Sequence, residues 1–430
     1  MRKYIMDTDT GELVSESSFD TSAFHDIELT QQLNETLELK LDPSWAITVG
    51  GSIFCKPVVE NGMIYFGCCD KKFYALSTEG RLIWDFETDG VILSSPCIVG
   101  EMVVFGSYDC NLYALEKSTG KLLWKFPAED KIFSKPCTDG KRIYFGSKDC
   151  NLYCIDTEGK LVWKFRTNGP IETHPLIHNN ILYFGSGDRN LYALDVEKGI
   201  LLWKFATKST LRAGFGVWND VIYFAGMERT LYGVNTDGKQ VFSFAMNDYG
   251  SNSILAENGI IYIPSRDNHL YAVKTNGEIL WKFKAANAVE APTFHKGVIY
   301  FGSCDCNLYA VDAFSGNLIW KFSSGNILVS TPVVCNGVIY MGGWDCNFYA
   351  LSASDGRVVW KFRTSISTVS KFDMELMRPQ RQFKTIWISE EEEKPEEKKE
   401  ERELSDYGKI ESDYTAGLSK DYIKGKKGYL

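Results

Sequence analysis

Residues 64–76 read Ile-Tyr-Phe-Gly-Cys-Cys-Asp-Lys-Lys-Phe-Tyr-Ala-Leu. Two apolar runs on either side of a polar turn predict a β-hairpin. The same phrase returns seven times, around Val104, Tyr144, Tyr183, Tyr223, Tyr262, Tyr300 and Tyr340. Most copies are followed by a tryptophan, with Phe242 in the fifth place: Trp84, Trp124, Trp163, Trp203, Trp281, Trp320 and Trp360. These positions recur every 39 or 40 residues, and a fixed period of that length is typical of a repeat array.

The second copy shows what one repeat builds. Its apolar runs 95–99, 102–106, 112–115 and 121–126 are separated by short turns that contain Gly, Asp, Asn, Ser or Thr. Each repeat therefore predicts four strands. Eight such units favour an all-β fold, an eight-bladed β-propeller of four-stranded blades over residues 45–364, because closure into a ring leaves only short strand edges exposed.

The spacing of alanine, glycine and tryptophan in these repeats resembles that of the pyrroloquinoline-quinone-type propeller family. Its tryptophan-docking motif is close to Ala-x-Asp-x-x-x-Gly-x-x-x-Trp, as in Ala193 to Trp203 and Ala310 to Trp320. The resemblance implies that the repeated tryptophans stack between neighbouring blades. The step from alanine to tryptophan is one residue shorter in the first, third, fifth and sixth units. The fifth unit also has Gly233 and Phe242, so docking is expected to be weakest there.

Two segments compete to close the ring. Residues 45–50, which begin with Trp45, look like an orphan fourth strand ahead of the first unit. The last unit, however, already contains Trp360-Lys361-Phe362. Either the two share the closing blade or one of them lies outside it.

Charge divides the chain into four parts. Residues 1–44 form an acidic N-terminal arm of net charge −7, with a possible short helix near 28–41, and residues 45–364 are neutral with 31 charges of each sign. Residues 365–388 are a docking segment with a predicted strand at 383–388, expected to dock on the propeller. Residues 389–430 are a charged, tyrosine-rich tail expected to be disordered. A neutral propeller with an acidic arm argues against nucleic-acid binding.

The composition also bears on the compartment. The N-terminus lacks the apolar stretch of a secretion signal, and no run reaches the ~18 apolar residues of a membrane span. Twelve cysteines without a secretion signal read as reduced thiols, so we expect a cytoplasmic protein.

An acidic residue occupies the same turn of every repeat: Asp70, Asp109, Asp149, Asp188, Glu228, Asp267, Asp305 and Asp345. A ring of carboxylates suits a cation or a basic partner. The preferred interpretation is turn chemistry, because Asp caps such hairpins by bonding to nearby backbone N–H groups.

Cysteine follows the aspartate in four of these turns, at Cys110, Cys150, Cys306 and Cys346. Strand spacing places corresponding turns of adjacent blades too far apart for a disulfide, and the other cysteines lack paired spacing with histidine. No metal site is predicted.

Cys68 and Cys69 are the residues that suggest an enzyme as the alternative function. In quinoprotein dehydrogenases of the resembled family, adjacent cysteines form a strained ring near the quinone. The repeats leave no space for the insertions that supply calcium ligands there, and no calcium set can be matched. No cofactor is therefore predicted, with pyrroloquinoline quinone as the less favoured alternative.

Residues just before the first strand of each blade are expected to line the mouth of the central channel: Lys56, Ser95, Lys135, His174, Gly214, Ser253, Ala291 and Thr331. Units five and six depart most from the repeat, with Arg212, Arg229 and Arg266 among the unusual residues. The candidate set for a small anionic ligand is Lys56, Cys68, Cys69, Lys135, His174, Arg212, Arg229 and Arg266.

Two functional hypotheses follow. The favoured one is a non-enzymatic propeller scaffold that presents its loop face and C-terminal tail to protein partners. The alternative is a redox protein that holds a quinone or another small anionic ligand over the channel. No catalytic residues are predicted, because the standard nucleophile and nucleotide motifs are missing and histidine is scarce.

Overall fold

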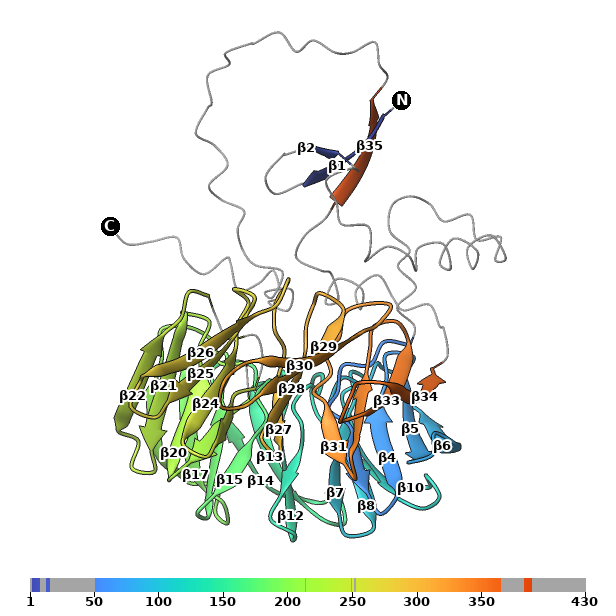
Figure 1. Ribbon diagram of the computed structural model, residues 1–430. Helices are drawn as coiled ribbons and strands as arrows, with labels where there is room; N and C mark the ends of the chain where they lie inside the picture. The colour runs from blue at the N-terminus through green and yellow to red at the C-terminus, as the bar shows by residue number, and fades with distance from the viewer. Residues whose placement is uncertain are drawn as a thin grey trace. The chain divides into compact units, whose positions relative to one another are not determined.

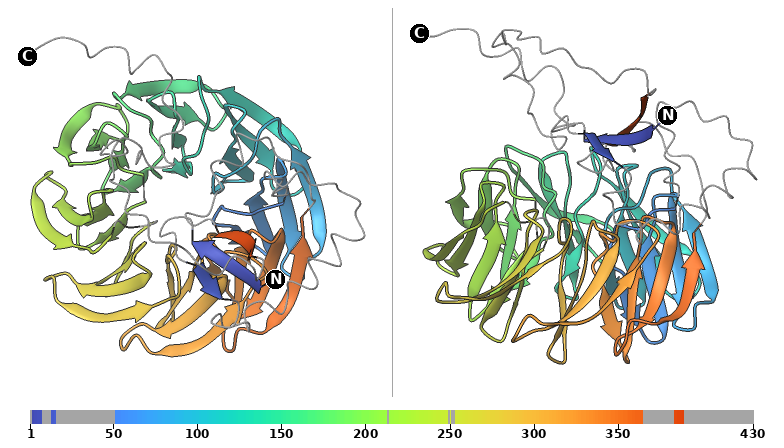
Figure 2. Two further views of the ribbon diagram at one scale, coloured as in Figure 1. Left: turned by 90° about the horizontal axis from the view of Figure 1, so that it is seen from above. Right: turned by 45° about the horizontal axis from the view of Figure 1, so that its top comes forward.

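The computed structural model describes residues 2–7, 13–15, 51–364 apart from 213, 249, 251 and 252, and 383–388. The chain divides into two compact units, Thr48–Thr368 and the terminal segments Met1–Ile47 with Val369–Leu430. The predicted eight-bladed β-propeller is confirmed: eight four-stranded antiparallel sheets form a ring (Figures 1 and 2). Each blade takes its four strands consecutively from the chain.

The first four blades occupy residues 58–206. Blade 1 comprises β3 (Val58–Glu60), β4 (Met63–Gly67), β5 (Lys72–Ser77) and β6 (Leu82–Glu87). Blade 2 comprises β7 (Cys97–Val99), β8 (Met102–Gly106), β9 (Asn111–Glu116) and β10 (Leu122–Pro127). Blade 3 comprises β11 (Cys137–Thr138), β12 (Arg142–Gly146), β13 (Asn151–Asp156) and β14 (Leu161–Arg166). Blade 4 comprises β15 (Leu176–His178), β16 (Ile181–Gly185), β17 (Asn190–Asp195) and β18 (Leu201–Ala206).

The other four blades complete the ring. Blade 5 comprises β19 (Gly216–Trp218), β20 (Val221–Ala225), β21 (Thr230–Asn235) and β22 (Gln240–Ala245). Blade 6 comprises β23 (Leu255–Glu257), β24 (Ile260–Pro264), β25 (His269–Lys274) and β26 (Ile279–Lys284). Blade 7 comprises β27 (Thr293–His295), β28 (Val298–Gly302), β29 (Asn307–Asp312) and β30 (Leu318–Ser323). Blade 8 comprises β31 (Val333–Cys335), β32 (Val338–Gly342), β33 (Asn347–Ser352) and β34 (Val358–Arg363).

The second unit contains a small sheet. Its strands β1 (Arg2–Asp7), β2 (Leu13–Ser15) and β35 (Phe383–Ile388) lie in the order β2-β1-β35. The predicted strand at 383–388 is therefore present, and its partner is β1, in antiparallel register from Arg2↔Ile388 to Asp7↔Phe383. The predicted helix near 28–41, the orphan segment 45–50 and the tail 389–430 lie outside the described residues. Within the described residues, no helix is long and apolar enough to cross a membrane.

The described residues show how blades 8 and 1 meet. The strand with Trp360 is the fourth strand of blade 8, so the described residues 333–363 supply all four strands of this blade. At the junction Trp360 Nε1 donates to the Thr78 carbonyl oxygen at 2.9 Å, and the rings of Phe66 and Phe348 stack with centroids 4.3 Å apart. The ring thus closes through contacts between two whole blades.

The core lies between the blades. The second and third strands of each blade are buried over most of their length, because both faces of these central strands are covered by neighbouring blades. Eight clusters of buried side chains each draw on two adjacent blades. Phe73 and Phe105, for example, stack across blades 1 and 2 with centroids 4.0 Å apart. Burial of one such ring contributes about 2–3 kcal/mol, so the interfaces stabilise the ring.

The repeated tryptophans connect each blade to the next. Trp84 pairs across the strand ladder with the small residue Ala75, and its Nε1 donates to the Lys117 carbonyl oxygen of blade 2 at 2.9 Å. Gly120 of blade 2 lies against the same indole: a Cβ at Gly120 would stand 2.6 Å from the ring, and its φ of +72° also favours glycine. The other indoles donate similarly, from Trp124, Trp163, Trp203, Trp281, Trp320 and Trp360.

Blade 5 differs at this point. Phe242 pairs with Gly233 and has no N–H to donate, and a Cβ at Gly277 of blade 6 would stand 3.9 Å from its ring. The phenyl ring therefore leaves a looser contact between blades 5 and 6 than an indole makes elsewhere.

Candidate functional site

The acidic residues of the eight turns are occupied by hydrogen bonds within the fold. Asp149 accepts the Asn151 N–H at 2.8 Å, the Tyr153 hydroxyl at 2.7 Å and the Glu129 N–H of the preceding linker at 2.9 Å. The carboxylate thus joins its own hairpin to the linker that enters the blade. Asp109, Asp188, Asp305 and Asp345 repeat this pattern. The turn interpretation of these residues is confirmed.

The cysteines of the same turns adopt a left-handed backbone conformation. Cys110, Cys150, Cys306 and Cys346 have φ between 62° and 71°, so each occupies the left-handed position of its hairpin. Burial raises the pKa of the Cys306 thiol to about 11, which keeps it protonated at neutral pH. None of the twelve cysteines forms a disulfide, and the described residues contain no cluster of three or more metal-ligating side chains.

Three of the predicted ligand-binding residues meet at the inner wall of the ring. Lys56, Lys135 and His174 occupy equivalent positions before the first strands of blades 1, 3 and 4. Blade 2 lies between the first two, and its Ser95 Oγ accepts the Lys56 N–H at 2.9 Å. All three residues lie just before the first strand of their blade, which places them on the same wall of the ring, and the two lysines lie near enough to His174 to act on it electrostatically. We call these three residues the axial cluster.

Burial and mutual repulsion act together on the axial cluster. Burial, followed by the repulsion of Lys135, lowers the pKa of Lys56 to about 8. The Lys56 side chain stays accessible to solvent, but the surrounding wall replaces enough water to disfavour its charge. Burial, then Lys135 and Lys56, lowers the pKa of His174 to about 4. At neutral pH His174 is therefore a neutral imidazole beside two lysines.

The absence of a side chain at Gly214 lets two polar side chains approach each other next to the axial cluster. Gly214 occupies the equivalent position in blade 5, where a Cβ would stand 2.3 Å from Ser253 Oγ and 3.6 Å from His174 Nδ1. The missing side chain lets the hydroxyl of blade 6 and the imidazole of blade 4 approach the same point. Ser253 is thereby placed beside the axial cluster as a further polar group.

The other predicted basic residues lie elsewhere. Arg212 Nε pairs with Glu172 Oε2 at 3.0 Å, and Lys148 Nζ pairs with Glu172 Oε1 at 2.9 Å. Arg229 stands in the β20–β21 turn, 3.7 Å from Asp248. These two arginines have carboxylate partners, in contrast to the axial cluster.

Arg266 lies in the β24–β25 turn of blade 6. It acts electrostatically on the thiol of Cys304, whose Sγ lies 3.6 Å from the Glu290 carboxylate. Arg266 thus belongs to a mixed environment of cation, thiol and buried carboxylate.

Cys68 and Cys69 are buried in the fold. Both thiols are 0% exposed, and Cys68 packs in the cluster between blades 8 and 1. Burial, followed by Asp70 and Cys69, raises the pKa of Cys68. These cysteines therefore present no surface that a ligand of the axial cluster touches.

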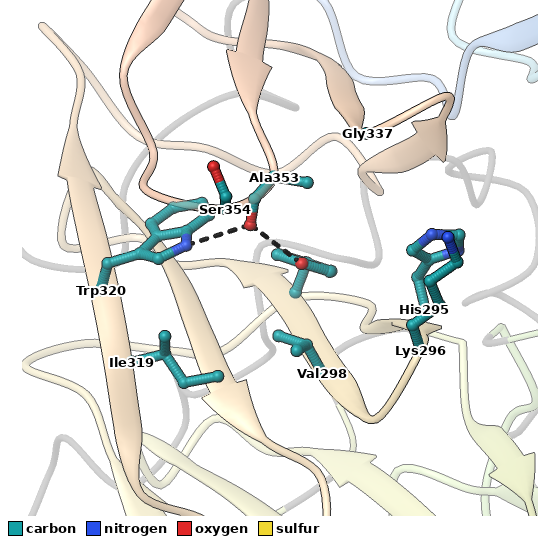
Figure 3. A pocket seen from close by; sticks show the side chains of 9 residues that line it. His295, Lys296, Val298, Ile319, Trp320, Gly337, Ala353 and Ser354 are labelled. Atoms are coloured by element: carbon teal, nitrogen blue, oxygen red, sulfur yellow. Dashed lines mark hydrogen bonds between the residues drawn. The ribbon is translucent and has the colours of Figure 1, made fainter.

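A pocket of about 400 Å³ lies between blades 7 and 8. Figure 3 shows His295 and Lys296 on one side and Trp320 with Ile319 on the other; Trp320 Nε1 donates to the Ala353 carbonyl oxygen at its back. Phe314 is 61% exposed, and its ring lies 3.9 Å from where a Cβ of Gly297 would stand. Gly297 belongs to the β27–β28 hairpin, and its neighbours Lys296 and Val298 line the pocket. Ile319 is 49% exposed on the outer strand β30.

The sequence interpretation overlooked Glu172 and this pocket. Glu172 stands where the first three units have Phe54, Leu93 and Phe133, and this break in the apolar pattern was the available signal. Phe314 likewise replaces small or polar turn residues, but an exposed aromatic in a turn is not distinguishable from a buried one by sequence.

The sequence matches the family described as the outer membrane protein assembly factor BamB (PQQ_2), through segments 4–133, 111–213, 201–302 and 274–381. No curated protein matches this sequence.

Solved structures share the fold at low identity. The crystal structure of BamB from Moraxella catarrhalis is 18% identical with a TM-score of 0.60, covering 72% of this chain and 96% of that chain. The computationally designed Ika8 protein is 14% identical with a TM-score of 0.63, covering 73% and 97%. The quinohemoprotein alcohol dehydrogenase ADHIIG from Pseudomonas putida HK5 is 13% identical with a TM-score of 0.60, covering 70% of each chain. At these identities the likeness concerns the fold.

Proposed function

Since the chain belongs to the BamB family of propellers, we propose that it is a non-enzymatic scaffold that binds a protein partner. The observation that carries this proposal is the exposed apolar surface at blade 7. Phe314 is the most exposed of the large apolar side chains in the described residues, and its ring lies near Gly297, between the pocket-lining residues Lys296 and Val298 in the sequence. Exposed aromatic and aliphatic groups gathered around a pocket mark interaction surfaces.

The chemistry of this surface suits an extended protein segment. Strand β30 is hydrogen bonded only to β29, so its outer edge is open to an added strand. An apolar side chain of the partner would enter the pocket between Ile319 and Trp320. Lys296 and His295 at the opposite side favour a neighbouring carboxylate on the partner.

The outer strands of other blades offer matched controls. Val162 precedes Trp163 as Ile319 precedes Trp320, and it is 45% exposed, but the residues of blade 3 lack an equivalent of Phe314. The two surfaces are compared by placing a photo-crosslinking amino acid at position 314, 319 or 162 of the full chain and expressing each variant in the host cells. Positions 314 and 319 should crosslink to one partner and position 162 should not.

Binding is then measured with that partner purified. Phe314→Ala should weaken binding at least about tenfold, the range of a single buried aromatic anchor, and Val162→Ser should leave it unchanged. Equal crosslinking at all three positions, or a Phe314→Ala variant that binds as tightly as the wild type, would refute the assignment of this surface. A variant ending at Ile388 tests whether the tyrosine-rich tail contributes to the same interaction.

The location belongs to the proposal as well. We place the protein in a reducing compartment, the cytoplasm, because its sequence carries twelve cysteines with no Cys-x-x-Cys pair. Fractionation of the host cells with an antibody to the full chain tests this placement, and recovery in a secreted or envelope fraction would contradict it. The quinone alternative is not carried further, because the cysteines that favoured it are buried.

A further inference from the structure

The axial cluster brings two lysines and a histidine together, with no acidic partner among the described residues. Among the described residues, no ion pair involves Lys56, Lys135 or His174. The charged groups that act on His174 are Lys135 and Lys56, and the one that acts on Lys56 is Lys135. Convergent cations in a partly desolvated place destabilise a fold unless an anion offsets them.

The surroundings supply hydrogen-bond donors of the kind that oxyanions need. Each ammonium group carries N–H donors, and the neutral imidazole of His174 carries one more. Ser253 Oγ and His174 Nδ1 both lie within 4 Å of the Cβ position of Gly214, so a hydroxyl stands next to the imidazole. Donors from blades 4 and 6 thus meet beside Gly214, and Lys56 and Lys135 occupy the equivalent positions in blades 1 and 3.

We propose that the inner wall of the propeller binds a small multivalent oxyanion, such as a phosphate or a polycarboxylate, between Lys56, Lys135 and His174. Two lysines provide the charge, and His174 with Ser253 adds directed hydrogen bonds. Gly214 leaves room for the Ser253 hydroxyl beside His174. The carboxylate partners of Arg212 and Arg229 exclude those residues from this role, which distinguishes the site from a general basic surface.

Calorimetry on the full chain tests the proposal, with inorganic pyrophosphate and citrate as separate probes at low ionic strength. One anion should bind per chain, and Lys135→Met and Lys56→Met should each weaken binding at least about tenfold, because each removes a full charge from a poorly solvated site. Lys135→Arg should retain binding. Lys125→Met and Lys321→Met, on exposed outer strands, are matched controls that should bind like the wild type.

Two further readouts separate an anion site from a structural role of the lysines. In anion-free buffer Lys135→Met should raise the melting temperature, since it relieves repulsion; a lysine needed for folding would lower it. At pH 8 wild-type binding should take up protons, seen as a heat that changes with the ionisation enthalpy of the buffer. An anion near Lys56 raises its pKa from about 8, so more of it becomes protonated.

Three results would overturn the proposal. One is no saturable heat from either probe at millimolar concentration. Another is equal weakening by the axial variants and by the control variants, which would indicate screening of surface charge. The third is unchanged affinity in both Lys56→Met and Lys135→Met, which would place any bound anion elsewhere on the molecule.

Discussion

Replacing Asp149 measures how much the turn carboxylates stabilise the ring. Asp149→Ala removes the acceptors of the Asn151 N–H, the Tyr153 hydroxyl and the Glu129 N–H, together with a contact of 3.0 Å to Asn151 Nδ2. The side chain is half-buried, so each of these four bonds contributes roughly 0.5–1 kcal/mol net. The expected loss is about 2–4 kcal/mol in the free energy of unfolding. Asp149→Asn keeps one carbonyl oxygen and should lose about half as much.

Thermal unfolding followed by circular dichroism gives the readout. For a unit of this size the unfolding entropy is roughly 0.7 kcal/mol per kelvin, so the melting temperature should fall by about 3–6 °C in Asp149→Ala. Asp237→Ala, in an exposed turn of blade 5, is the control and should change it by less than about 1 °C. A drop in Asp149→Ala no larger than in the control would refute the assignment of these carboxylates to turn bonding. Stabilisation of the wild type by calcium, lost in the variant, would instead support the cation-binding alternative.

Three further predictions concern single positions. Phe242→Trp should stabilise the protein by about 1 kcal/mol, because the looser contact at Gly277 has room for an indole, and at the other junctions the indole N–H donates to a carbonyl oxygen of the next blade. A lower melting temperature than the wild type would show that the larger ring overpacks the interface. His174→Gln should lose less stability in acid than the wild type. The pKa of His174 in the folded protein, about 4, lies below the usual 6.5, so the free energy of unfolding of the wild type falls by up to about 3 kcal/mol as the pH drops from about 6.5 to 4. Urea titrations of the two proteins should therefore diverge in that pH range. Parallel acid profiles would contradict the neutral state of the half-buried His174. Cys68 and Cys69 should resist alkylation at pH 8 until the protein is denatured, as mass spectrometry of labelled peptides would show; rapid labelling of the native protein would contradict their burial.

The fold was predictable because every repeat contains the sequence features that predict its own four strands. The hairpin phrase, the turn glycine and the tryptophan lie within 40 residues of each other, and local patterning reports such features. The closure of the ring was not predictable in the same way. Trp45 and Trp360 stand in similar local sequences, and the choice between them depends on contacts between residues almost a whole chain apart.

The candidate site was predictable only in part, for the same physical reason. Lys56, Lys135 and His174 share one position of the repeat, so their meeting at the axis followed from symmetry. The partners of Arg212 and Arg229 are carboxylates that the fold brings near, and the repeat pattern marks Glu172 as unusual without indicating which residue it pairs with. The burial of Cys68 and Cys69 likewise depends on how blade 8 packs against blade 1.

The seam between blades 8 and 1 has a consequence for the architecture of the chain. The Thr364 hydroxyl donates to the Gly51 carbonyl oxygen at 2.6 Å, so the two ends of the propeller segment meet. Every blade is contiguous in sequence, and seven of the eight junctions use the same indole and glycine contact, with Phe242 in place of the indole between blades 5 and 6. A circular permutant opened at another linker would therefore keep all eight blades intact. No blade has to come first in the sequence, and the order of the blades along the chain is one of eight orders that would form the same ring.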